Sequence, residues 1–205
     1  MTTLKISENM TGKMLGIRCL STSNMNNPTC QSRRNIEGSV CQKCFAYNVS
    51  RRYPSLRNNL ELNSEALSVL LDDKDLPMIN KVGEEIFRLE AFGELINTYH
   101  AMNYINIAYK NPNIRFALYT KNIGILEHAI SIIGKPANLV VVQSSLMINI
   151  PDAVISPIAD HLFTVYNKAY ISMNNIDVNC GARDCMSCQK CYNKQGIMHI
   201  NEQLK

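Results

Sequence analysis

Apolar runs of strand length alternate with segments of helical periodicity through the middle of this chain. Strands are expected at 86–92, 114–119 and 139–143, with helices at 98–110 and 123–133 between them. This strand–helix alternation is typical of parallel α/β proteins. The pattern therefore predicts an α/β fold with a parallel sheet, either open or curled into a partial barrel.

The outer parts of the chain give weaker signals. A helix is expected to begin near Ser55, with Pro54 near its first turn, and to extend to Leu71. Further strands are expected at 153–156 and 162–166. No internal repeat or low-complexity linker divides the sequence, so we expect residues 1–205 to form a single domain.

Eight cysteines fall into two sets that a long cysteine-free stretch separates. One set lies in segment 19–44 and the other in segment 180–191. The N-terminal residues lack the apolar core of a signal peptide, and no apolar run approaches the roughly 18–20 residues of a membrane span. We therefore expect a soluble cytoplasmic protein without a membrane partner, in which clustered thiols stay reduced and bind metal.

The C-terminal set is the stronger metal signal. Its cysteines are separated by four, two and two residues, and they are Cys180, Cys185, Cys188 and Cys191. Structural zinc sites usually use two knuckles that a longer stretch separates. A short run with two-residue intervals instead resembles the loop that winds around a cuboidal cluster in bacterial ferredoxins. An iron–sulfur cluster, most simply 4Fe-4S, is favoured over zinc.

The N-terminal set is more loosely spaced. Cys41 and Cys44 form a two-residue knuckle, whereas Cys19 and Cys30 are each either a ligand or a buried thiol. Two arrangements remain open: each set holds its own centre, or three cysteines of one set share a centre with one of the other. The first arrangement is favoured, and all eight cysteines are candidate metal ligands.

Several stretches of the chain together resemble a known family, the phage gene product eighty-eight proteins. They cover most of residues 19–122, and the terminal cysteine run also fits. The main stretches are Cys30, Cys41-Gln-Lys-Cys44-Phe45-Ala46-Tyr47, Arg52-Tyr53-Pro54-Ser55-Leu56-Arg57, Phe87-Arg88-Leu89-Glu90-Ala91-Phe92-Gly93-Glu94 and Asn111-Pro112-Asn113-Ile114-Arg115-Phe116.

The resemblance implies a strand–helix protein related in layout to radical S-adenosylmethionine barrels. It also implies that Cys30 is a ligand, and that the protein acts in the cytoplasm of a host cell. Two departures matter. The family's usual Gly-Asp-Phe is replaced by Gly93-Glu94-Leu95, which lengthens the carboxylate. The C-x3-C-x2-C spacing of ordinary radical enzymes is absent, so cleavage of S-adenosylmethionine is not carried over.

Polar residues follow the predicted strands, where parallel α/β folds bind ligands. Glu90 and Glu94 follow the first strand, and Lys121 follows the second. Carboxylates and a lysine beside a cluster suit proton transfer or capture of an anionic substrate. These three are the candidate catalytic residues. The alternative is structural: Lys121 faces solvent and Glu94 caps the following helix.

Arginines make the N-terminal third locally basic, which suits either a solvated helix face or contact with nucleic acid. The leading hypothesis is an iron–sulfur protein with one or two clusters, acting as an oxidoreductase or radical-type enzyme on a small or nucleotide-like substrate. The alternative is a zinc-stapled module that binds nucleic acid or a host protein without catalysis.

Overall fold

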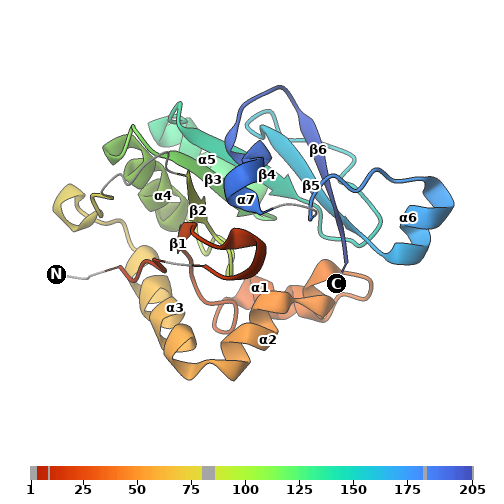
Figure 1. The fold of residues 1–205 in the computed structure, drawn as a ribbon. Helices are drawn as coiled ribbons and strands as arrows, with labels where there is room; N and C mark the ends of the chain where they lie inside the picture. Colours follow the sequence, from red (N-terminus) through yellow and green to blue (C-terminus); the bar gives the residue numbers. More distant parts are fainter. Residues whose placement is uncertain (1–3, 9, 80–85, 182–183, 205) are drawn as a thin grey trace.

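A single parallel sheet organises the protein (Figure 1). The computed structural model describes residues 4–8, 10–79, 86–181 and 184–204. Within these residues six strands lie side by side in chain order, and every neighbouring pair is parallel. The strands are β1 (Arg18–Leu20), β2 (Ile86–Leu89), β3 (Arg115–Thr120), β4 (Leu139–Ser144), β5 (His161–Tyr166) and β6 (Met198–Gln203). β1 and β6 are the edges, so the predicted parallel sheet is confirmed and it is open rather than closed.

The three central strands lie where the apolar runs predicted them. The expected strand at 162–166 is also present as β5, whereas the segment 153–156 consists of bends and unpaired backbone. The two edge strands, β1 and β6, were not expected from the sequence. Both are short or polar in composition, so neither carries the apolar run by which a buried strand is recognised.

Among the described residues the three predicted helices are present, and four further helices were not expected. The first predicted helix ends four residues before the expected Leu71. The expected helix near Ser55 begins at Pro54 and ends at Leu67, and a separate helix precedes it. The helices are α1 (Pro28–Arg34), α2 (Phe45–Arg52), α3 (Pro54–Leu67), α4 (Thr98–Lys110), α5 (Ile123–Ile133), α6 (Lys168–Asn174) and α7 (Cys185–Cys188). Short 3-10 turns lie at η1 (Gly12–Met14), η2 (Val40–Lys43), η3 (Asp73–Asp75) and η4 (Lys190–Tyr192). No described helix is long and apolar enough to cross a membrane.

One face of the sheet, which we call the helix face, carries the main hydrophobic core. Because side chains alternate along a strand, every second residue of each strand points to this face. Phe87, Phe116 and Val141 belong to it and pack in one cluster with Tyr104 of α4 and Leu126 of α5. Burial of large side chains here supplies most of the stabilising apolar contact of the fold.

The opposite face, which we call the cysteine face, is covered by the C-terminal cysteine segment. Ala117 of β3 packs with Tyr192 and with the half-buried Cys185 and Cys191. Val140 and Val142 of β4 form a second cluster against β6 that also includes Cys191. In Figure 1, α7 accordingly lies over the middle of the sheet. The segment 180–191 is therefore an integral layer of the domain.

Cys19 lies in β1, whereas the other three N-terminal cysteines lie in α1, in η2 and directly before α2. Figure 1 shows α1 and α2 near the end of the sheet where β6 finishes. α1 begins sharply because the Asn27 side chain accepts hydrogen bonds from the backbone N–H groups of Thr29 and Cys30, while Pro28 occupies its first turn. η2 is held to the sheet by a hydrogen bond from Val40 N to Leu146 O (2.9 Å). These contacts fix the positions of both short cysteine-bearing elements.

Candidate metal centres and cavity

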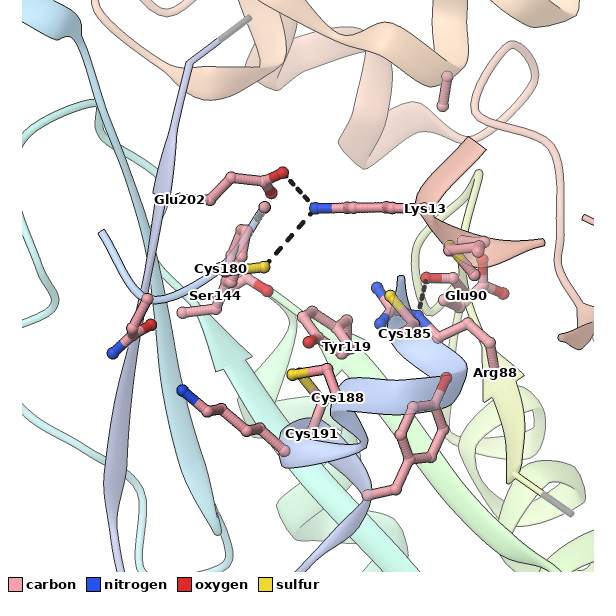
Figure 2. Close-up of a pocket in the computed structure, with 18 of the residues that line it drawn as sticks. Lys13, Arg88, Glu90, Tyr119, Ser144, Cys180, Cys185, Cys188, Cys191 and Glu202 are labelled. Carbon is pink, nitrogen blue, oxygen red and sulfur yellow. Dashed lines mark hydrogen bonds and ion pairs between the residues drawn. The ribbon is translucent and has the colours of Figure 1, made fainter. Parts of the chain in front are cut away.

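A cavity of about 700 Å³ opens on the cysteine face toward the carboxyl ends of the strands (Figure 2). Ligands in parallel α/β sheets bind at this end. The cavity wall combines residues from most of the sheet with the C-terminal cysteine segment. Its lining includes Cys44, Arg88, Glu90, Glu94, Tyr119, Lys121, Ser144, Cys180, Cys185, Cys188, Cys191 and Glu202.

All four C-terminal cysteines line this cavity. Cys180 is anchored to β6, because its backbone N–H donates to Asn201 O (3.0 Å). Asp184 caps α7 by accepting from Ser187 N (2.8 Å), and Gln189 ends the helix in a left-handed conformation. The chain therefore winds across the sheet and presents its thiols to one space. Residues 182–183, within this segment, lie outside the described part.

Two cations accompany these thiols. The Lys13 ammonium is placed between Cys180 Sγ, at 3.6 Å, and the Glu202 carboxylate, with which it forms an ion pair (Figure 2). The Arg88 guanidinium lies 3.2 Å from the centre of the Tyr119 ring. Among the described carboxylates none forms an ion pair with Arg88. Burial by itself would lower the pKa of the half-buried Arg88 guanidinium, but Tyr119, Tyr192 and Cys191 outweigh burial and raise it.

The protonation of these thiols reflects their crowding. Burial raises the pKa of Cys185 to about 11, although Lys13 and Arg88 act against it. Burial also raises the pKa of Cys180 and Cys191. For these three thiols, nearby thiols add to the rise, because closely spaced groups cannot all ionise without a positive centre between them. A cationic metal centre would supply that charge.

A second, smaller cavity of about 70 Å³ adjoins the first. Three N-terminal cysteines, Cys30, Cys41 and Cys44, line it. Burial, reinforced by Glu94, Glu90 and the two neighbouring thiols, raises the pKa of Cys30 far above its usual range. Cys44 lines both cavities, so the two cysteine sets face neighbouring spaces.

Cys19 is separate from both sets. It lies on β1 with 1% of its surface exposed and lines neither cavity. Its thiol donates to Met10 Sδ (3.3 Å), and the Ser21 hydroxyl donates to it at 3.8 Å. The structure therefore groups seven of the eight predicted ligands and places the eighth in the interior.

Glu94 ties together the ends of β2, β3 and α1. Its carboxylate accepts from Lys121 N (2.7 Å), Leu95 N (2.8 Å) and the Thr120 hydroxyl. Arg33 Nη1 is 3.7 Å from the same carboxylate. The carboxylate is buried and accepts three hydrogen bonds from the chain, so its observed contacts are those of a structural anchor. It does not cap α4, whose N-cap is Asn97.

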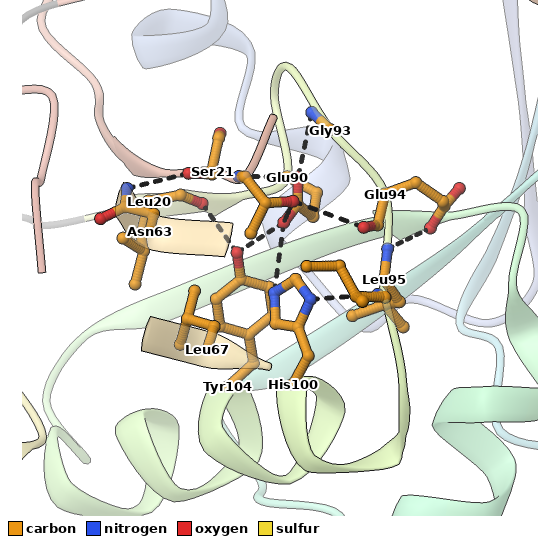
Figure 3. A network of polar contacts seen from close by, with 12 residues as sticks. Leu20, Ser21, Asn63, Leu67, Glu90, Gly93, Glu94, Leu95, His100 and Tyr104 are labelled. Carbon is orange, nitrogen blue, oxygen red and sulfur yellow. Dashed lines mark hydrogen bonds and ion pairs between the residues drawn. The ribbon is translucent and has the colours of Figure 1, made fainter. Parts of the chain in front are cut away.

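Glu90 is the centre of a buried polar network (Figure 3). Its carboxylate accepts from the hydroxyls of Thr22 (2.9 Å) and Tyr104 (2.6 Å) and from Gly93 N (3.0 Å). His100 Nε2 lies 3.3 Å from it. Burial alone would raise the pKa of this carboxyl, but His100, Tyr104 and Thr22 outweigh burial, so the pKa lies below its usual value.

The Glu90 backbone has φ of 56°, in the left-handed region that non-glycine residues rarely adopt. Gly93 is equally constrained, since a Cβ there would lie 2.5 Å from Thr22 O and 2.8 Å from Glu90 Oε2. The network therefore fixes the turn after β2 in one conformation. This turn forms part of the wall of both cavities.

Lys121 is half-buried and lines both cavities. The side chains of Glu90 and Glu94 accept hydrogen bonds that hold the fold together, whereas the Lys121 side chain takes no part in these bonds. The structure thus brings Glu90, Glu94 and Lys121 together at one end of the sheet, as their positions after the strands predicted. A catalytic role for any of them remains a prediction.

Sequence reasoning did not select Lys13, Tyr119 or Glu202 for the site. Arg88 and Tyr119 face the same way because β2 and β3 pair in parallel with Arg88 opposite Ala117. The alternation of side chains along the two predicted strands could therefore have indicated that Arg88 and Tyr119 lie on the same face of the sheet. No such signal was available for Lys13 and Glu202, because no helix or strand was predicted for the segments that contain them.

In the part of the chain that the structure describes, no three His, Cys, Asp or Glu side chains form a group that could hold a metal ion. All eight cysteines are free thiols. The types of side chain present nevertheless suit a thiolate-bound centre, because four half-buried thiols share one cavity with Lys13 and Arg88. The metal-binding role of both segments is therefore a matter for experiment.

Comparison with known proteins supplies a family. The family model described as Gene product 88 matches residues 3–204. The chain belongs to this phage protein family. The match spans both cysteine segments and the whole sheet, and it confirms the resemblance that residues 19–122 indicated. No curated protein and no solved structure shows a significant match to this gene product 88 protein.

Proposed function

We propose that this gene product 88 protein is an iron–sulfur enzyme that uses two cysteine sets around one cavity to act on a small or nucleotide-like substrate. The observation that carries the proposal is the convergence of seven cysteines from opposite ends of the sequence on two neighbouring cavities. Free thiols at this density would have little reason to share a space unless they bound a common kind of centre.

The two sets differ in the number of thiols that they contribute. The C-terminal set contributes four thiols, all at the large cavity, and the N-terminal set contributes three at the small cavity, of which Cys44 also lines the large one. Four cysteines saturate a cubane cluster, whereas three leave one iron without a protein ligand. Such a centre, when bound, supplies electrons or a Lewis-acidic iron. The three-cysteine set is therefore the proposed reactive site, and the four-cysteine set is the proposed electron carrier.

Charged residues of the chain suit this division. Lys13 and Arg88 stand beside the four-cysteine set and would offset the negative charge of a thiolate-bound cluster. Lys121 and Arg33 act on Cys41 in the three-cysteine set. In this proposal Lys13 and Arg88 stabilise the centre beside them, and Lys121 and Arg33 attract an anionic substrate.

The large cavity is the proposed binding site for the substrate. A volume of about 700 Å³ is typical of sites for small molecules and nucleotides. Ser144 and Lys121 provide polar groups at its wall, and Glu90 and Glu94 hold the turn that separates it from the small cavity. In this proposal both carboxylates position the reactive site and neither transfers protons.

The alternative, a zinc-stapled module that binds nucleic acid, gains less support from the N-terminal arginines. Arg33 donates to Lys121 O (3.3 Å), and Arg34 lies 3.8 Å over the Tyr47 ring. Arg51 lies 5.7 Å from the centre of the same ring. Both Arg33 and Arg34 are directed into the fold, and the ring most suited to stacking on a base is already covered.

Anaerobic purification of cysteine variants tests the proposal. Cys188→Ser should lose the iron and acid-labile sulfide of one centre, and Cys44→Ser that of the other, so each variant retains about half of the wild-type content. The matched control is Cys19→Ser, which removes a thiol outside both cavities and should retain all the iron. Zinc at the same stoichiometry in place of iron, or full iron in both cavity variants, would refute the proposal.

A further inference from the structure

Three residues that line the small cavity each have a buried polar atom without a hydrogen-bond partner. These atoms are Asn24 Oδ1, Arg33 Nη1 and Arg34 Nη1. All three residues line the cavity beside Cys30, Cys41 and Cys44. Buried polar atoms are nearly always paired in folded proteins. Three exceptions around one space therefore indicate that something absent from the free chain pairs with them.

Asn24 defines the first requirement. Its side chain is held in place, because Nδ2 donates to Phe92 O (2.9 Å) and to the Ser50 hydroxyl (3.4 Å), and the residue is 2% exposed. Its carbonyl oxygen is therefore fixed and can only accept. Thiolates and cluster sulfides are acceptors themselves, so a metal centre on the three cysteines cannot satisfy it.

The two arginines define the second requirement. Arg33 uses Nη2 on Lys121 O, and its Nη1 is 3.7 Å from Glu94 Oε2, which is too long for a hydrogen bond. Arg34 is held by its stacking on Tyr47. Each of the two arginines that line the cavity therefore has a buried Nη1 without a hydrogen-bond partner. Adjacent guanidinium donors are suited to a carboxylate, which accepts at two oxygens.

We infer that the small cavity binds an α-amino or α-hydroxy carboxylate group. Its carboxylate accepts from Arg33 and Arg34, and the adjacent ammonium or hydroxyl donates to Asn24 Oδ1. This inference rests on the proposed function, since the group would be one end of the substrate or of a co-substrate.

The remainder of such a ligand has a route outward. Phe92, Gly93, Glu94 and Lys121 form walls of both cavities. A molecule anchored in the small cavity can therefore extend past Cys44 into the large one. The rigid turn after β2, held by Glu90, is the rim that it would cross.

Titration of the iron-loaded protein, followed by NMR and calorimetry, tests the inference. The probes are L-alanine, L-lactate, acetate and inorganic phosphate. L-alanine or L-lactate should bind saturably, and acetate, which lacks the second donor, should bind at least about tenfold more weakly. Arg34→Gln should weaken binding of the preferred probe about tenfold or more, and Asn24→Ala should reduce the preference over acetate. Arg52→Gln, an exposed arginine on α2, is the charge-matched control.

Iron and sulfide are measured on the same samples, which separates two kinds of failure. Absence of iron would refute the proposed function whatever the titration shows. Normal iron with no saturable binding of L-alanine or L-lactate would overturn the inference alone and leave water as the partner of the three atoms. Equal binding of acetate or phosphate would also overturn it, because the site would then recognise any small anion.

Discussion

Replacement of Gly93 by alanine tests the rigid turn between the two cavities. The added Cβ would lie 2.5 Å from Thr22 O and 2.8 Å from Glu90 Oε2, closer than carbon and oxygen normally approach. Relief would have to move the turn and lengthen the 3.0 Å hydrogen bond from Gly93 N to Glu90. Overpacking costs about 1–3 kcal/mol, and a weakened bond to a buried carboxylate adds about 1 kcal/mol.

A total of about 3 kcal/mol corresponds to a fall in Tm of about 6–12 °C for a domain of this size. Calorimetry or circular dichroism measures the fall, with Gly124→Ala as the matched control. Gly124 lies in the first turn of α5, and a Cβ there meets nothing within 4 Å. Alanine at that position should leave the Tm unchanged or raise it slightly, because it favours the helix. A Gly93→Ala Tm equal to that of wild type would refute the structural role given to this turn.

Three further predictions concern the charged groups of the site. Glu90→Gln should lose about 2–4 kcal/mol of stability at neutral pH. Because the pKa of Glu90 is lowered in the folded protein, its contribution to stability is present above about pH 4.5 and is lost as the pH falls through the folded pKa. The difference in unfolding free energy between the variant and wild type, measured by urea denaturation, should therefore shrink in acid. A difference that stays constant with pH would contradict this. Lys121→Ala should change stability by less than about 0.5 kcal/mol and leave iron content unchanged, and a large loss of Tm would make this lysine structural. Arg88→Gln should make a cluster on the four-cysteine set harder to reduce, and an unmoved potential in voltammetry would show that Arg88 does not offset its charge.

The central fold was predictable because its signals are local. The helices at 98–110 and 123–133 have clear periodicity and recognisable ends, and the structure places α4 and α5 at the same residues. The edge strands β1 and β6 were not predicted, because they form strands only through pairing with the neighbouring strands of the sheet. β6 reads Met-His-Ile-Asn-Glu-Gln, and only pairing with β5 makes it a strand.

The candidate site was predictable in its residue types and less so in its grouping. The spacing from Cys180 to Cys191 marks one set by itself, and the structure gives these four cysteines one cavity. The spacing of Cys19 and Cys30 did not show which of them reaches a cavity. The difference arises from the fold, because Cys19 lies inside strand β1 and Cys30 lies on helix α1. The anchoring of Glu90 was also hidden, since its partner Tyr104 is contributed by a distant helix.

The measurement that tests the account most directly is the iron and acid-labile sulfide content of wild-type protein purified without oxygen. Two cubane clusters predict a brown protein with about eight irons and eight sulfides per chain and a visible absorption that bleaches on reduction. A colourless protein with stoichiometric zinc, or one that folds with neither metal, would contradict the assignment of the two cysteine sets to iron–sulfur centres.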